Sequence, residues 1–542
     1  MDILASVLLA LSGVLFLLFL RRLAVNPNNR KSKPLRIPEI PGSLPFIGHL
    51  HLLGGKDMLA RKLAAFADKH GSMFTIRLGS YPTVVVSDFE SMKDCFVKND
   101  RALAARPPST QGKILGKNFA VFGFASYGEY WRNVKKLIIT EVLSLPRIKA
   151  LRHVQVSEVD VLLRDLHLQC RSSNNSQLAD DHHAQVVISD WLQNFVLNII
   201  TRMVAGKKYF ENLADSVGVA EAGGRPVGEL IREFMDVNGS LVLSDLIPIL
   251  GWIDIKGMKK AMRRISKELD VIVDGWIEEH KVKRNKLGDN LVPEDFIDVM
   301  LSVVDDKKKG GKICYVSYTN ISILCFMYIQ AVIIAAADTT SVTLTWMLSN
   351  LLNNRRTMAA LKQEMDEKVG KDRIVQDSDL ENLTYLHAAI RETLRMHPAG
   401  PISVPRVASE DITIRGFHVP KGTRFFANFW KLHRNPEMFP EPDEFRPERF
   451  YDEEVKVDIY GRDFEYLPFG TGRRSCPGMN FGMQVVQLTA ARLIQAFDFG
   501  TPFDLPVDMT EADSTTLAKE KPLEVVLTPR LSPELYQLPV IV

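Results

Sequence analysis

One cysteine near the C-terminal end lies in a segment whose residue types suit a metal-bound thiolate. Residues 469–478 read F-G-T-G-R-R-S-C-P-G, which places the cysteine at position 476. A thiolate ligand has to stay deprotonated, so it needs positive charge and backbone N–H donors nearby, and glycines let the chain pass close beneath a flat macrocycle. Arg474 supplies charge that can pair with a porphyrin propionate, while Gly472 and Gly478 permit turns that other residues disfavour. The segment therefore predicts that Cys476 binds a haem iron.

Two other interpretations of this segment explain less of it. Most lone cysteines in Gly/Pro loops are ordinary buried residues, but a plain core position does not need the full pattern F-x-x-G-x-R-x-C-x-G that begins at Phe469. A phosphate-binding glycine loop is the other alternative, but Gly470-x-Gly472 is not followed by the third glycine of that motif or by the lysine of a P-loop.

An acid beside an alcohol follows a long uncharged stretch. Residues 315–337 carry no charged side chain, and Asp338 and Thr339 come directly after them. Protons must reach dioxygen at a haem face while bulk water stays out, and an acid and an alcohol on a helix crossing that face suit this task. A surface Asp-Thr-Thr-Ser turn is the alternative, although such a turn rarely ends a buried apolar helix. We predict that Asp338 and Thr339 are catalytic.

These motifs resemble those of the cytochrome P-450 monooxygenases. Residues 469–478 resemble that family's haem loop, and three further motifs precede it in the family's order: A-A-A-D-T-T at 335–340, E-T-L-R at 392–395 and F-R-P-E-R-F at 445–450. The resemblance spans essentially the whole chain, and the wording around the cysteine is similar to plant A-type members of family 82, which includes nicotine demethylases and benzylisoquinoline alkaloid hydroxylases. It implies haem b and a mainly α fold with a small β portion, the cytochrome P-450 fold, in a single large catalytic domain.

The resemblance also implies a structural ion-pair network. Glu392 and Arg395 are one helical turn apart and so share a helix face, and a buried pair of this kind needs a third partner such as Arg449. In the family these three residues support the haem loop. An ordinary exposed pair is the alternative for any E-x-x-R sequence.

Further haem contacts are implied at Trp131, Lys135 and Arg406. Trp131 and Lys135 resemble the family's W-x-x-x-R helix, with lysine in place of the usual arginine, so a bidentate propionate contact is lost. Arg406 resembles another propionate ligand. Each of these residues has an ordinary surface position as its alternative. Ala336 stands where the family usually has glycine, and its methyl group would narrow or reshape the groove beside the oxygen site.

The N-terminal segment predicts a membrane anchor. Residues 3–20 are uncharged and apolar, long enough to cross a bilayer as a helix, and Arg21 and Arg22 follow them. A cleaved signal peptide would carry its basic residues before the apolar stretch. We expect a transmembrane signal anchor at 1–22, a basic, proline-rich hinge at 23–50 and a catalytic domain at 51–542. The protein would be single-pass in the endoplasmic reticulum membrane, with the catalytic domain in the cytosol. The second uncharged stretch, 315–337, is expected to be a core helix rather than another span.

Composition excludes several classes of protein. The formal net charge is only +3 and no basic patch is interleaved with aromatics, so nucleic acid is not expected as a partner. The five cysteines are scattered without C-x-x-C spacing, which favours a reducing compartment and argues against disulfides or a zinc site. No histidine cluster indicates a second metal.

Electrons must come from another protein, because no G-x-G-x-x-G follows a strand. The resemblance implies a membrane-bound, NADPH-dependent reductase with FAD and FMN that docks near the cysteine side. The leading hypothesis is a plant monooxygenase that uses O2 to hydroxylate or demethylate a small hydrophobic substrate such as an alkaloid or terpenoid. A reductase-independent haem-thiolate isomerase or dehydratase and a non-enzymatic membrane scaffold are the alternatives. By resemblance, the substrate pocket is lined by residues 111–124, 334–337, 402–404 and 515–518.

The coarse pattern predicts mostly helix between residues 109 and 290. Short β-branched runs indicate hairpins at 71–87 and at 415–430, the second turning at Pro420–Gly422. A late helix is expected from Met479 to Phe497, with its N-terminus toward the thiolate.

Overall fold

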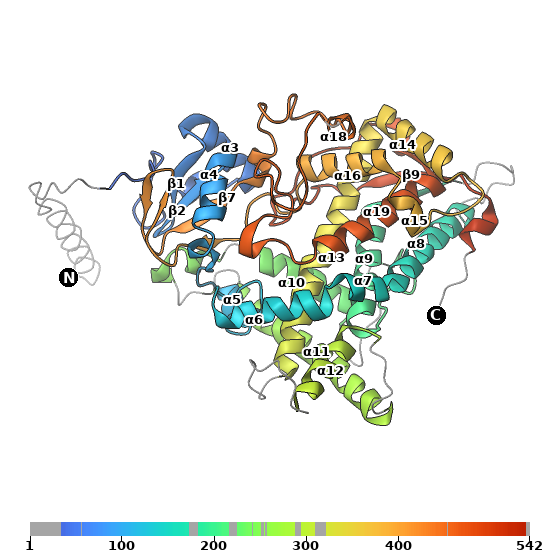
Figure 1. Cartoon of the computed structure of the whole chain (residues 1–542), viewed down its shortest axis with the longest axis horizontal. Helices are drawn as coiled ribbons and strands as arrows, with labels where there is room; N and C mark the ends of the chain where they lie inside the picture. The colour runs from blue at the N-terminus through green and yellow to red at the C-terminus, as the bar shows by residue number, and fades with distance from the viewer. Residues whose placement is uncertain are drawn as a thin grey trace, which may run out of the picture.

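The computed structural model describes residues 34–537 except 56, 173–182, 216–224, 241, 251–253, 255–256, 288–293, 309–320 and 453. The predicted anchor at 1–22 lies outside these residues, as does the first part of the hinge. Helices dominate the described chain, and the strands form small sheets, as predicted (Figure 1).

The helices are α2 Leu50–Leu53, α3 Leu59–His70, α4 Phe89–Lys93, α5 Thr110–Ile114, α6 Glu129–Leu137, α7 Leu145–Ala150, α8 Arg152–Ser172, α9 Ile188–Ala205, α10 Val227–Gly239, α11 Met258–Leu287, α12 Phe296–Lys308, α13 Ile321–Asn353, α14 Arg355–Lys368, α15 Asp377–Leu380, α16 Thr384–Met396, α17 Phe429–Leu432, α18 Glu448–Tyr451 and α19 Met479–Ala496. The strands are β1 Met73–Leu78, β2 Tyr81–Val86, β3 Ala184–Val187, β4 Arg406–Val407, β5 Ile412–Ile414, β6 Phe417–Val419, β7 Arg424–Ala427, β8 Phe497–Gly500 and β9 Glu524–Pro529.

A four-stranded sheet lies at one side of the molecule and the long helices at the other (Figure 1). Its strand order is β1-β2-β7-β4, and β1 pairs with β2 in the hairpin predicted at 71–87, so that prediction is confirmed. The proline-rich segment joins this sheet, because the Thr75 N–H donates to the Pro38 carbonyl at 2.7 Å.

The second predicted hairpin is wrong in its register. β6 pairs with β5, not with β7, and the turn between them is at Arg415 and Gly416, whose φ angles are 50° and 81°. Two adjacent positive φ values are typical of the tight turn that matches strand twist. β7 is buried along its whole length and pairs in parallel with β2, so burial between neighbouring strands outweighs the local turn signal at Pro420–Gly422.

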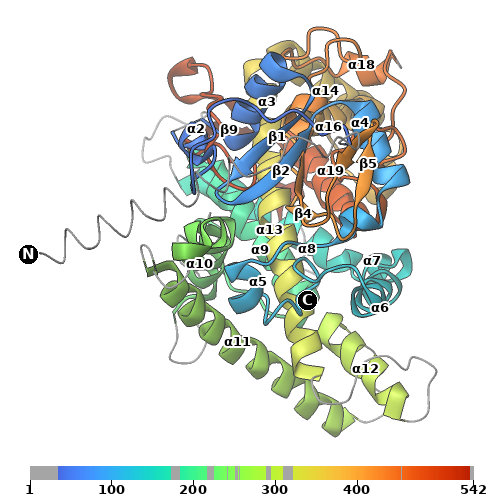
Figure 2. The same ribbon diagram turned by 90° about the vertical axis from the view of Figure 1, so that its left-hand side faces the viewer.

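The long helix α13 runs through the middle of the protein (Figure 2). It contacts α9, α11, α16 and α19, while most of the stretch 315–337 that was predicted to lie in the core falls outside the residues whose side chains are described. Residues 341–350 are all buried, and their hydroxyl groups donate to backbone carbonyls of the preceding turn, as Thr345 does to Ser341 at 2.8 Å. These local bonds satisfy polar groups that burial would otherwise penalise. Among the described residues, no helix combines the length and the apolar character that a membrane crossing requires.

The late helix agrees with its prediction almost to the residue, since α19 begins at Met479 and ends at Ala496. Helices α11 and α12 lie at the end of the molecule farthest from the four-stranded sheet (Figure 2).

Candidate functional site

The loop before α19 is closed by its own backbone. The Cys476 N–H donates to the Phe469 carbonyl at 2.9 Å, and the chain between them turns through Gly470 and Gly472, whose φ angles are 64° and 70°. A Cβ added to Gly472 would come 2.5 Å from Oδ1 of Asp100, so this glycine is required both by its backbone conformation and by the space around it.

The Cys476 thiol lies on an internal surface. Its side chain is exposed, yet burial raises the pKa of the thiol, and a hydrogen bond from the Gly478 backbone opposes this rise. The sulfur is therefore accessible, although many protein atoms surround it. α19 begins three residues later, so the positive end of its dipole is close to the sulfur. A bound metal ion would deprotonate such a thiol.

Three guanidinium groups cluster beside the loop, from Arg106, Arg406 and Arg474. Burial lowers the pKa of Arg474 to about 9 and the pKa of Arg406 to about 10. The pKa of Arg106 is also lowered, first by burial and then by repulsion from the positive charges of Arg474 and Arg406. Asp100 is the nearby carboxylate, but it pairs with Arg473 at 2.7 Å and is 4.0 Å from Arg406. Arg406 is buried and Arg106 and Arg474 are partly buried, and Asp100 does not neutralise their combined charge, so an anionic group would stabilise the cluster.

Trp131 points an unsatisfied donor into the same region. Its side chain is buried, its Nε1 has no hydrogen-bond partner, and its ring stacks on Phe122 at 5.2 Å. The guanidinium of Arg474 lies 4.5 Å from the ring centre, and Lys135 contacts the ring from 5.2 Å. The structure thus brings together the residues predicted from the haem loop and from the W-x-x-x-K helix.

The guanidinium of Arg474 and the amine of Lys135 also bind backbone carbonyls. Arg474 donates to the Ala104 carbonyl at 2.7 Å, and Lys135 donates to the Arg473 carbonyl at 2.5 Å. Nη1 of Arg406, by contrast, is buried without a hydrogen-bond partner.

On α13, Asp338 and Thr339 lie where the uncharged stretch ends. Burial raises the pKa of Asp338, and the Thr516 hydroxyl opposes that rise. The Thr339 hydroxyl donates to the Ala335 carbonyl at 2.6 Å. Ala335 is exposed and Ala336 and Thr339 are partly so, although the following turns of the helix are buried. This part of α13 therefore presents an acid and an alcohol to accessible space.

Glu392, Arg395 and Arg449 form one fully buried network. Arg395 binds Glu392 with two hydrogen bonds of 2.8 Å, and Arg449 donates to the same carboxylate at 3.0 Å. The remaining guanidinium donors bind backbone carbonyls between residues 433 and 444, for example Arg395 to Pro442 at 2.8 Å and Arg449 to Pro440 at 2.9 Å. Complete satisfaction is what makes buried charges tolerable.

His433 connects this network to the cysteine loop, and sequence reasoning missed it. Its carbonyl accepts a hydrogen bond from Arg395 at 3.0 Å, and its Nε2 accepts one from the Leu467 N–H at 2.9 Å. Gly470 in turn binds the Leu467 carbonyl. Burial and the neighbouring Arg395 lower the pKa of His433 to about 3, so the ring is neutral and able to accept. A single histidine carries no pattern in the sequence that would have indicated this role.

Two of the four segments predicted to line a substrate pocket contact the guanidinium groups, and a third contacts α13. In residues 111–124 the Phe122 carbonyl accepts from Arg474, and in residues 402–404 the Val404 carbonyl accepts from Arg106. The turn at 515–518 meets α13, where Trp346 donates to the Leu517 carbonyl. For 334–337, only the side chains from residue 335 onward lie within the described residues.

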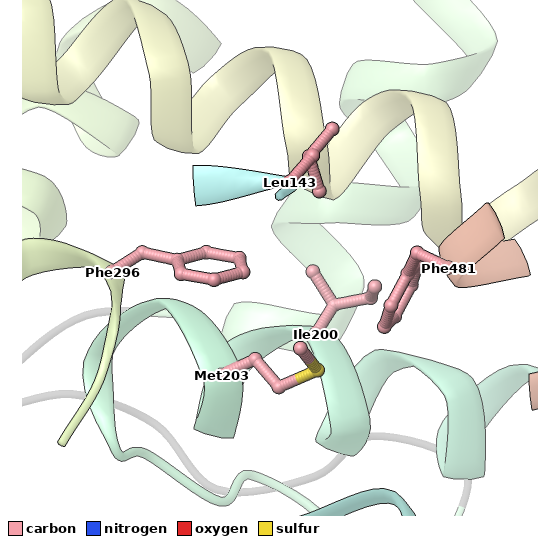
Figure 3. A pocket seen from close by; sticks show the side chains of 5 residues that line it. All are labelled: Leu143, Ile200, Met203, Phe296 and Phe481. Atoms are coloured by element: carbon pink, nitrogen blue, oxygen red, sulfur yellow. The ribbon is translucent and has the colours of Figure 1, made fainter. Parts of the chain in front are cut away.

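A separate apolar pocket is lined by side chains that include Phe481 of α19 (Figure 3). Its cavity of about 10 Å³ corresponds to the space of a single water molecule, and it offers that water no polar partner, so it is a packing defect rather than a substrate site. The lining residues are Leu143, Ile200, Met203, Phe296 and Phe481.

Comparisons with known proteins agree with this geometry. The profile of the family described as Cytochrome P450 matches residues 38–527. The chain is 45% identical to CYP82J17 of Trigonella foenum-graecum (94% of this chain, 95% of the relative), 43% to the xanthotoxin 5-hydroxylase CYP82C4 of Arabidopsis thaliana (95% and 97%) and 40% to the nicotine N-demethylase CYP82E3 of Nicotiana tomentosiformis (94% and 95%). A zebrafish cytochrome P450 structure with abiraterone superimposes with a TM-score of 0.67 at 24% identity, over 87% of this chain and 99% of that one, which shows a shared fold.

Proposed function

Because this chain belongs to the cytochrome P450 family and is a P450 monooxygenase with relatives in plant family 82, we propose that it oxidises a small hydrophobic compound of plant specialised metabolism, such as an alkaloid or terpenoid. Hydroxylation and demethylation are the reactions for which its relatives are named. The observation that carries the proposal is the cysteine loop flanked by an uncompensated guanidinium cluster.

The residues present fit a haem with two propionates. Arg106, Arg406 and Arg474 hold excess buried positive charge, and Nε1 of Trp131 and Nη1 of Arg406 are buried donors without acceptors. The carboxylate groups of the propionates would supply both the missing negative charge and the missing hydrogen-bond acceptors. Cys476 would bind the haem iron, because its sulfur is accessible. When bound, the haem supplies the iron at which dioxygen is activated, with thiolate ligation favouring O–O cleavage.

Asp338 and Thr339 would hold and move protons where α13 faces accessible space. The raised pKa of Asp338 lets its carboxyl group carry a proton closer to neutral pH than an ordinary aspartate does. The Thr339 Oγ1 gives its own hydrogen to the Ala335 carbonyl and so keeps its lone pairs available to accept a hydrogen bond. Together they can pass a proton inward while the apolar helix excludes bulk water.

Electrons would come from an NADPH-dependent FAD/FMN reductase. Three basic side chains are exposed on and near the cysteine loop: Arg132, Lys136 and Arg473. The guanidinium groups of Arg132 and Arg473 both contact the ring of Tyr127. Such a basic surface suits the acidic face of a reductase. We place the protein in the endoplasmic reticulum membrane as a single-pass protein with a cytosolic catalytic domain, on the strength of the uncharged residues 3–20 and the arginines that follow.

A reductase-independent isomerase or dehydratase is the second candidate. It would act on a peroxide and need no proton delivery to dioxygen, so the retained Asp338 and Thr339 favour the oxygenase. Turnover of substrate without NADPH would reverse this ranking.

Microsomes containing the protein and a reductase test the proposal. We expect a thiolate-type band in the carbon monoxide difference spectrum of the reduced protein, and NADPH-dependent oxidation of one class among alkaloids, terpenoids and phenolics, read by mass spectrometry. Cys476→Ala should abolish the band, whereas the exposed-site control Glu278→Gln should retain it. A wild-type protein without this band, or a Cys476→Ala variant that keeps it, would show that the haem assignment is wrong.

A further inference from the structure

A second cluster of ligand-type side chains lies far from the cysteine loop, between α11 and the start of α12. His280, Asp295 and Asp298 each offer a ligand atom, and these atoms lie within 4.8 Å of one another. All three residues are buried, with exposed fractions of 6%, 4% and 0%. Carboxylates are rarely buried to this degree without a partner for their charge.

Helix capping accounts for only half of the carboxylate oxygens. Oδ1 of Asp295 accepts the Asp298 N–H at 2.9 Å, and Oδ2 of Asp298 accepts the Glu294 N–H at 3.2 Å, a reciprocal cap at the start of α12. The second oxygen of each aspartate is left over. Oδ2 of Asp295 lies 2.7 Å from Nε2 of His280, and Oδ1 of Asp298 is buried with no hydrogen-bond partner.

The orientation of His280 turns a ring nitrogen toward Asp295. Its Nδ1 lies 2.6 Å from the Trp276 carbonyl, which can only accept, so Nδ1 carries a hydrogen. Nε2 of a neutral ring is then a lone pair that faces a carboxylate oxygen. Two acceptors 2.7 Å apart need either a proton shared between them or a metal ion that both of them bind. In metal-binding histidines, one ring nitrogen usually donates a hydrogen bond to a backbone carbonyl or a carboxylate. That bond orients the ring so that the other nitrogen can bind the metal ion.

A proton satisfies only part of the cluster. It would join His280 to Asp295 but leave Oδ1 of Asp298 buried without a donor, which is unfavourable for a carboxylate oxygen. A divalent cation would be shared by all three side chains and would balance the two carboxylates. We propose that His280, Asp295 and Asp298 bind a zinc-class divalent metal ion that fastens α12 to α11.

The surroundings suit this assignment. One nitrogen and two carboxylate oxygens are a common ligand set for zinc, which completes its four positions with water, whereas magnesium prefers oxygen ligands alone. The C-terminal end of α9 approaches as well, because a Cβ added at Gly206 would come 3.5 Å from Oδ2 of Asp295. The partial negative charge of that helix end favours a cation. Lys283 binds Glu294 at 2.5 Å and lies 3.8 Å from Asp298, so it is the nearest positive side chain that these ion pairs show beside the cluster.

No sequence pattern indicates this site, because fourteen residues separate His280 from Asp295, two separate Asp295 from Asp298, and only one of the three is a histidine. The proposal does not depend on the haem chemistry. It would still bear on the active site, because Phe296 follows Asp295 and packs in the apolar pocket opposite Phe481 of α19 (Figure 3).

Zinc titration of the full-length holoprotein tests the proposal. After treatment with a chelator and its removal, we expect calorimetry to detect one saturable Zn²⁺ site and thermal unfolding to occur at a higher temperature with Zn²⁺ than without it. Mg²⁺ should produce neither effect. Asp298→Asn keeps the shape of the side chain and its cap acceptor, and we expect it to weaken Zn²⁺ binding at least tenfold. Glu294→Gln changes a carboxylate beside the cluster but outside it, and should bind Zn²⁺ as the wild type does.

Two results would overturn the metal site in favour of a proton-held ion pair: no saturable Zn²⁺ binding by the wild type, or equal binding by Asp298→Asn. The carbon monoxide spectrum verifies that each variant is folded. If Asp298→Asn does not fold, X-ray absorption of the zinc-loaded wild type gives the answer. A first shell of only nitrogen and oxygen supports the site, and sulfur in that shell refutes it.

Discussion

Replacing Glu392 with glutamine should destabilise the protein far more than the loss of one surface charge. Oε1 of Glu392 accepts from Arg395, from the Arg446 backbone and from Arg449 at 2.8 to 3.0 Å, and Oε2 accepts a second bond from Arg395. The better glutamine orientation keeps the first three bonds. In that orientation the glutamine amide nitrogen replaces Oε2 and faces Nε of Arg395. Both atoms are hydrogen-bond donors, so the fourth bond is lost and the two N–H groups repel each other.

The magnitude follows from the burial. All three ionic side chains have an exposed fraction of zero, and the variant leaves two guanidiniums without a countercharge. Removing one partner of a buried ion pair costs about 3–5 kcal/mol. Folded proteins are stable by about 5–15 kcal/mol, so this loss is a large part of the total. Because the 433–444 segment and Leu467 depend on the network, haem retention should fall together with stability.

The measurement is thermal unfolding of the purified holoprotein, followed by haem absorbance and by the thiolate-type carbon monoxide band. Glu278→Gln is the matched control, since it breaks an exposed i,i+3 pair with Lys281 and should cost no more than about 1 kcal/mol. If Glu392→Gln unfolds at the same temperature as Glu278→Gln and keeps its haem equally long, the structural role argued for the buried network is refuted.

Three further predictions concern the haem side, the proton path and pH. Gly472→Ala should lower haem retention, because a left-handed φ costs a side-chain-bearing residue about 1–2 kcal/mol and the new Cβ would collide with Asp100; stability equal to wild type would contradict this. Thr339→Ala should keep the carbon monoxide band but yield less product per NADPH consumed; unchanged coupling would exclude the hydroxyl from proton control. The pKa of His433 is lowered to about 3, so the unfolded chain takes up a proton near its ordinary value of about 6.5 while the folded protein does not. The contribution of neutral His433 to the free energy of unfolding is therefore fully present above about pH 6.5 and is lost as the pH falls toward 3. The loss from this residue is up to about 1.4 kcal/mol per pH unit. His433→Gln should make the decrease of the unfolding temperature between pH 6 and 4 shallower, and an unchanged slope would show that the ring is not held neutral.

The parts of the protein that were predictable from the sequence are those fixed by neighbours along the chain. The glycines, arginines and cysteine of residues 469–478 lie within one loop, and α19 follows them with its predicted bounds. Spacing alone also placed Glu392 and Arg395 on one helix face, where they bind each other.

Tertiary structure decided whatever depends on residues distant in the chain. β7 pairs with β2 rather than with β6, because burial on both faces rewards a central position in the sheet more than a local turn does. Arg106 joins Arg406 and Arg474 across several hundred residues, and His433 reaches the cysteine loop through Leu467.

The cluster of His280, Asp295 and Asp298 illustrates the same limit. The sequence by itself determined the chemistry of the cysteine loop and the family, since ligand type, charge and turn geometry are local properties. Only folding decided which buried charges lack a partner, because desolvation and ion pairing depend on what other elements bring to the same place.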